Sequence, residues 1–220
     1  IMSAEEKVVD NYLVWELCKQ QDIKGKIIDG SPDGEELKKE IVDKVRQEYE
    51  EKDYGLDEKL DQVDKLHSNS DHMVKMFEYC SWSKETVNIE DLGTTLPHAL
   101  DLPPEVITGT LPEVLEFVRK EDPEEYRGIK YINSLKEVPE VLDKFLTVVI
   151  SPGEIIRRQD RMKKQHGDKD WDIKETWGAV HDANHRTIAK ILANDLEKIE
   201  CYVGRPSTDK IFEHVQLDEE

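Results

Sequence analysis

The stretch from Asp170 to Glu200 restricts the fold of this chain more than any other part of the sequence. It contains no proline and one glycine, Gly178, so its composition favours an uninterrupted helix. Helical spacing of about 3.6 residues per turn brings its apolar side chains onto one stripe that also holds two histidines: Trp177, His181, His185, Ile188, Leu192, Leu196 and Ile199. We therefore predict one helix, unbroken from Trp171 to Glu200, with this stripe facing the core. His181 and His185 would then lie one turn apart, close enough to bind one ion.

The rest of the chain also favours helices. Ser3 and Glu6 have the spacing of a capping box, and Thr110 is a candidate N-cap for a helix over 110–120. Apolar spacing and proline positions predict further helices within 32–51, 56–67, 72–82 and 139–149 and an irregular segment at 83–112. Residues 129–135 would form an irregular connection or, as the alternative, a brief strand. The predicted fold is all-α: an antiparallel helical bundle of five to seven helices with an irregular proline-rich insertion. Residues 2–203 would form a single helical domain, and residues 204–220 a linker and polar C-terminal tail.

The charge of the chain limits its partners. With 31 basic and 50 acidic residues the formal net charge is -19, which argues against a nucleic-acid partner because phosphate backbones need clustered Lys and Arg. The acidic residues are spread along the sequence, which favours a role in solubility over a surface that docks a basic partner. As partners we expect a small-molecule substrate or a basic protein. No apolar run approaches the roughly 20 residues that cross a bilayer, so we expect no membrane association. Three scattered cysteines are typical of a reducing compartment, and we expect a cytoplasmic protein.

A metal site built on His181 and His185 would need a third ligand from another helix. His67 is the first candidate, because it continues the apolar stripe formed by Leu56, Leu60 and Val63. His72 is the alternative to His67. The ion would be zinc or nickel. The competing interpretation is that the two histidines are structural core residues, whose buried nitrogens bond to carbonyl or carboxylate oxygens.

The segment TWGAVHDANHRTIAKIL resembles the corresponding helix of the DinB/YfiT-like family of metal-binding helical bundles. The matching residues are His181, His185 and Arg186, with His67 or His72 as the earlier histidine. The resemblance implies a three-histidine site for a divalent ion, and it implies an activity among the metal-dependent hydrolases and thiol S-transferases of that family. The HDANH segment can also be compared with the H-E-x-x-H motif of zinc peptidases, with Asp182 in the place of the general base, which is the weaker interpretation.

Two classes of function remain open from the sequence. The first is a metal-dependent hydrolase or thiol S-transferase, in which the bound ion lowers the pKa of water or a thiol. The second is a non-catalytic acidic helical protein with an interaction or regulatory role and structural histidines. The metal content of the purified protein separates the two.

Overall fold

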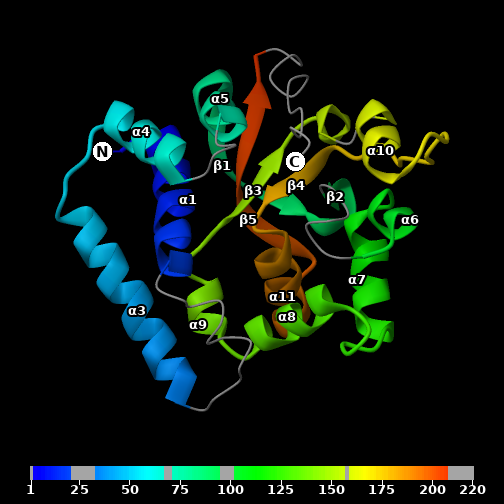
Figure 1. Ribbon diagram of the computed structural model, residues 1–220, viewed down its shortest axis with the longest axis horizontal. Helices are drawn as coiled ribbons and strands as arrows, with labels where there is room; N and C mark the ends of the chain where they lie inside the picture. Colours follow the sequence, from blue (N-terminus) through cyan, green and yellow to red (C-terminus); the bar gives the residue numbers. More distant parts are fainter. Residues whose placement is uncertain (1, 21–32, 67–70, 95–101, 157–158, 208–220) are drawn as a thin grey trace.

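The computed structural model describes residues 2–20, 33–66, 71–94, 102–156 and 159–207. In these ranges, helices surround a five-stranded mixed sheet, so the fold is α/β and the predicted all-α helical bundle is wrong (Figure 1). The strands are β1 (Cys80–Asn88), β2 (Leu92–Thr94), β3 (Thr147–Ile150), β4 (Gly178–Asp182) and β5 (Lys198–Pro206). The α-helices are α1 (Ala4–Gln20), α3 (Asp33–Glu50), α4 (Leu56–Leu66), α5 (Asp71–Tyr79), α6 (Pro104–Ile107), α7 (Leu111–Lys120), α8 (Arg127–Lys136), α9 (Pro139–Leu142), α10 (Gln159–His166) and α11 (Asn184–Asn194). Two 3-10 helices, η1 (Ile89–Asp91) and η3 (Gly153–Ile155), complete the described elements.

The order of strands across the sheet is β1-β5-β3-β4-β2. The longest pair is antiparallel β1 and β5, in register from Cys80 opposite Pro206 to Asn88 opposite Lys198. In the middle of the sheet, β3 runs parallel to β5 and antiparallel to β4, and β2 pairs with β4 in parallel. All four residues of β3 are buried, as expected for a strand with neighbours on both sides.

The largest difference from the sequence-based prediction lies between residues 170 and 200. In place of one helix, the chain forms no regular element over 170–177 and then folds as β4, α11 and β5. Ala183 and Asp195 bound the helix with left-handed φ angles of 70° and 49°. The prediction failed because a short buried strand and one side of a helix place apolar residues at similar spacings, and pairing with β2 and β3 decides between them.

Other predictions have mixed outcomes. The irregular segment predicted at 83–112 contains most of β1 and all of β2, and the connection predicted at 129–135 lies within helix α8. The helix predicted over 139–149 ends at Leu142, and the chain from Thr147 onward is β3. Residues 204–206 of the predicted linker belong to β5, while residues 208–220 lie outside the described part.

Helix starts were predicted more successfully. The Glu6 amide donates to Ser3 Oγ at 3.1 Å and the Ser3 amide to Glu6 Oε2 at 2.8 Å, which is the predicted capping box of α1. The Thr110 amide likewise donates to Glu113 Oε2 at 2.7 Å at the start of α7.

Of the described helices, none combines the length and apolar composition that crossing a membrane requires.

Candidate functional site: the turn between β4 and α11

Polar side chains gather where strand β4 ends and helix α11 begins. We call residues 181–187 the β4–α11 turn; its polar members are His181, Asp182, Asn184, His185, Arg186 and Thr187. The two histidines and Asp182 are partly exposed, so the outer side of the turn reaches solvent. The other three polar side chains are buried.

The backbone of the turn leaves the start of α11 without a capping side chain. Ala183 occupies the N-cap position with φ 70° and ψ 27°, and it makes no side-chain cap hydrogen bond. The Thr187 amide donates to the Ala183 carbonyl at 2.8 Å, which closes the first turn of the helix. The first amides of α11 lie at the positive end of the helix dipole.

Arg186 lies beneath the turn as a buried cation. Its side chain is 4% exposed, and its guanidinium carbon lies 4.1 Å from the centroid of the Trp15 ring and 5.2 Å from that of Phe145. Nη2 donates to Asp182 Oδ2 at 3.3 Å. Nη1 is also buried, and it makes no hydrogen bond to any residue that the structure describes.

The electrostatic setting of Arg186 combines burial with nearby acidic groups. Burial lowers the pKa of the guanidinium from its ordinary value, while Asp182 opposes this change most strongly, followed by Tyr131 and Glu16. A guanidinium does not lose its proton in proteins, so Arg186 remains a positive charge in a poorly solvated place. Asp182 accepts a hydrogen bond from Nη2, and the buried Nη1 has no partner among the described residues.

Contacts between distant segments hold Arg186 in place. The Asn11 side chain bonds both the amide and the carbonyl of Leu146, at 2.8 and 2.9 Å, and so fixes the chain before β3 against α1. This places Phe145 against Trp15, with ring centroids 5.1 Å apart. On the other side of the turn, the Thr147 and Thr187 hydroxyls are 2.6 Å apart and buried, joining β3 to α11.

The two predicted histidines lie on different elements. His181 is in β4 and His185 in α11, so they are not one turn apart on a helix, although the β4–α11 turn keeps them within the same short segment. The His185 ring packs against Tyr131 of α8, with centroids 5.1 Å apart. His72 is on α5, and His67 lies outside the described residues.

The predicted metal-binding helical bundle is corrected by the same observations. Within the ranges that the structure describes, no group of three or more His, Cys, Asp and Glu side chains is arranged to hold a metal ion. The predicted all-α bundle is replaced by a mixed sheet with surrounding helices.

No protein-family model, no curated protein and no solved structure matches this chain. These comparisons consequently have no bearing on the resemblance to the DinB/YfiT-like family. The local geometry of the β4–α11 turn carries the functional argument.

Sequence reasoning selected this segment for its histidines and missed the role of its helix start. One signal was present: Asp182 and Asn184 are residue types that favour helix starts over helix interiors. The burial of Arg186 had no local signal, because its neighbours Trp15 and Phe145 come from distant parts of the sequence.

Proposed function

We propose that this protein binds a phosphorylated small molecule, whose phosphate group lies at the β4–α11 turn. The observation that carries the proposal is the buried Arg186 guanidinium, which has one edge paired with Asp182 and a buried Nη1 without a partner among the described residues. A guanidinium fork matches the oxygens of a phosphate, and a buried cation gains more from an anionic ligand than an exposed one.

The start of α11 adds to this attraction. Helix N-termini bind phosphate groups because their first amides donate outward and the helix dipole is positive there. Ala183 has no side-chain oxygen to occupy these amides, in contrast to the Ser, Thr, Asp or Asn that usually stands at an N-cap. The partly exposed His181 and His185 lie at the end of β4 and in the first turn of α11, next to this helix start.

The net charge favours a compact ligand over a polymer. A chain with net charge -19 repels a nucleic-acid backbone, whose many phosphates each need a nearby cation. A single phosphate or diphosphate group is held by contacts within a few ångströms. At about 0.15 M salt, screening over roughly 8 Å removes much of the repulsion from distant carboxylates.

The test is calorimetric titration with inorganic pyrophosphate. Arg186→Ala should weaken binding about 10- to 100-fold, because a charge-assisted hydrogen bond contributes roughly 1.5–3 kcal/mol. Asp182→Asn should strengthen binding, because it removes a negative charge beside the ligand and releases the second edge of Arg186. This gain is the sharper result, since it cannot arise from a variant that fails to fold.

The matched control is Arg205→Ala, which changes the net charge equally at a partly exposed arginine of β5 that pairs with Glu85. Its pyrophosphate affinity should equal that of the unmodified protein. Failure of the unmodified protein to bind pyrophosphate, or a folded Arg186→Ala variant that binds it unchanged, would refute the proposal.

The expected cytoplasmic location is part of the same proposal. Cys18, Cys80 and Cys201 are free and buried, as suits a protein that functions among reduced thiols and soluble phosphorylated metabolites.

A further inference from the structure

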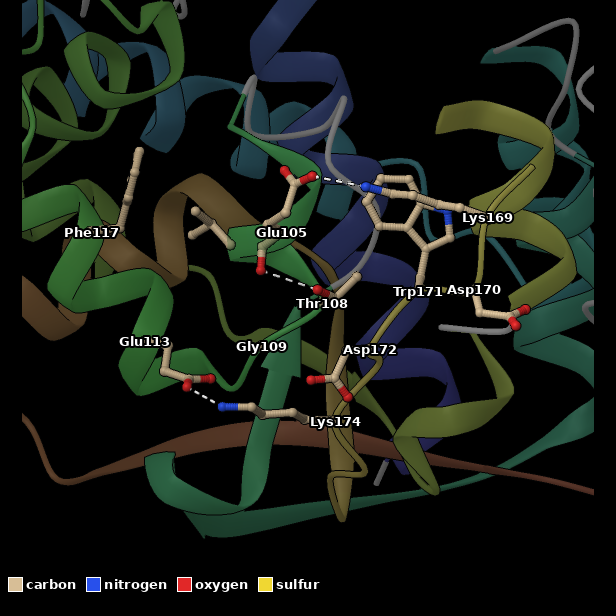
Figure 2. Close-up of a pocket in the computed structure, with 11 residues that line it drawn as sticks. Glu105, Thr108, Gly109, Glu113, Phe117, Lys169, Asp170, Trp171, Asp172 and Lys174 are labelled. Atoms are coloured by element: carbon tan, nitrogen blue, oxygen red, sulfur yellow. Dashed lines mark hydrogen bonds and ion pairs between the residues drawn. The ribbon is translucent and has the colours of Figure 1, made fainter. Parts of the chain in front are cut away.

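A hollow lies away from the β4–α11 turn, between helices α6 and α7 and the segment that follows α10 (Figure 2). Its volume is about 560 Å³. The side chains that define its chemistry are Glu105, Glu113, Lys169, Trp171, Asp172 and Lys174. We call this hollow the Trp171 cavity.

The Trp171 cavity already holds a cation on an aromatic face. Lys169 Nζ lies 3.9 Å from the centroid of the Trp171 ring and 3.2 Å from Glu105 Oε1. Figure 2 shows the lysine reaching across the indole toward Glu105. An indole face combined with a carboxylate is a favourable place for an ammonium or guanidinium group. The Lys169 side chain is 55% exposed, so it can leave this place for water without breaking a buried contact.

The indole itself is held firmly. Trp171 is 6% exposed, and its Nε1 donates to the Gly167 carbonyl at 3.3 Å. The Trp171 amide donates to Gln159 Oε1 at 3.0 Å, and the Gln159 side-chain amide donates back to the Trp171 carbonyl. The aromatic face therefore stays in position when the lysine above it moves.

Negative charge is in excess around the cavity. Glu105 is paired with Lys169, and Glu113 with Lys174. Asp172 is exposed and makes no ion pair with any described residue, and it lies between the Trp171 ring and Lys174 along the same segment (Figure 2). Asp172 would therefore attract an incoming cation, because neither Lys169 nor Lys174 neutralises its charge.

We propose that the Trp171 cavity binds a lysine or arginine side chain from a basic segment of a partner protein, which takes the place of Lys169 on the indole. The net charge of -19 supports a protein partner, because a strongly acidic molecule attracts a basic surface over long distances and accelerates its association. The cavity is also larger than a single amino group requires, so it has room for the residues on either side of a bound lysine or arginine. This inference is independent of the phosphate site.

The experiment titrates the full chain with a short peptide of alternating lysine and glycine, followed by calorimetry. Lys169→Ala should tighten peptide binding, by roughly two- to tenfold, because it removes the internal competitor from the indole. Asp172→Asn should weaken binding by a similar factor. Both positions are exposed, and thermal unfolding of each variant confirms that the fold is kept.

Two controls separate the cavity from general charge effects. Lys130→Ala on α8 changes the net charge as Lys169→Ala does, and Asp61→Asn on α4 matches Asp172→Asn. Both should leave peptide affinity unchanged within about twofold. Equal effects of Lys169→Ala and Lys130→Ala would overturn the inference, as would absence of peptide binding. Spermidine binding as tightly as the peptide would also overturn it, because the site would then recognise a small polyamine.

Discussion

At the scale of single residues, Ala183 is the position on which the strand–turn–helix geometry depends. Its φ of 70° is left-handed, a conformation that favours glycine over any residue with a Cβ. The left-handed backbone at this position separates strand β4 from helix α11. Its replacement by glycine therefore tests the local fold.

Ala183→Gly should raise the free energy of unfolding by about 0.5–1 kcal/mol, because glycine adopts the left-handed angle without strain. The same substitution at Ala189, buried within α11, should lower it by about 1 kcal/mol or more, through lost helix propensity and a lost methyl contact. Urea denaturation of both variants measures the difference. A loss of stability at both positions would indicate a continuous helix through residue 183.

A second residue-scale prediction concerns the buried Lys59, which joins α4 to α1. Its side chain is 7% exposed, and its Nζ lies 2.9 Å from Asp10 Oδ1, which also accepts a 2.6 Å hydrogen bond from the Tyr49 hydroxyl. Asp10→Ala should destabilise the protein by about 3–5 kcal/mol, because it leaves a buried cation without a partner. Lys59→Met should cost less, since Asp10 keeps its bond to Tyr49. A smaller effect of Asp10→Ala than of Lys59→Met in urea denaturation would contradict this account.

At the scale of elements, local signals predicted helix starts and failed on strands. Capping residues marked α1 and α7, because a cap depends on side chains three residues apart. Strand β4 had no such marker. Its one glycine, Gly178, is explained by the sheet, where an added Cβ would lie 2.7 Å from Val149 of β3. That constraint comes from pairing with a distant strand and is invisible in local spacing.

At the candidate site, too, local spacing predicted part of the arrangement and long-range packing determined the rest. Apolar periodicity selected His181 and His185, and the structure places both in the β4–α11 turn, but on two elements and not on one helix face. Arg186 entered the sequence-based prediction only through the family resemblance. Its importance comes from packing against Trp15 and Phe145, which depends on how α1 and β3 meet.

The reactivity of the three buried cysteines tests whether α1, β1 and β5 pack as described. Cys18 in α1, Cys80 in β1 and Cys201 in β5 are buried, and burial raises the pKa of each thiol from its ordinary 9.0 to about 12. In the folded protein at about pH 8, they should react with a thiol reagent such as Ellman's reagent far more slowly than in urea, because the thiolate is the reactive form. Fast labelling of any one of them without denaturant would show that its element is misplaced.

The same pKa changes fix the direction of a pH effect. The unfolded thiols ionise near 9.0 and the folded thiols near 12, so the folded state binds protons more tightly. The thiols' contribution to stability is present below pH 9.0 and is lost as the pH rises toward 12. Replacing the buried Cys201 by alanine should reduce this alkaline loss, as measured by urea denaturation at several pH values.

At the scale of the whole molecule, the two proposed sites should respond differently to salt. The net charge of -19 assists a basic peptide and opposes pyrophosphate. Raising the salt from about 0.05 to 0.3 M should weaken peptide binding several-fold, because the exposed charges around the Trp171 cavity are screened. Pyrophosphate binding should change much less, since the attraction of the buried Arg186 is screened less and the long-range repulsion also decreases. Parallel losses of affinity in calorimetry would place both ligands on the general surface.

The central claim is that β4, a left-handed Ala183 and the start of α11 form a phosphate site. Backbone NMR of the labelled protein, titrated with pyrophosphate, tests it most directly. The account predicts strand chemical shifts over 178–182 and helical shifts from 184 onward, with the largest ligand-induced amide changes at residues 183–187. Helical shifts throughout 178–194, or ligand-induced changes that leave residues 183–187 unaffected, would contradict it.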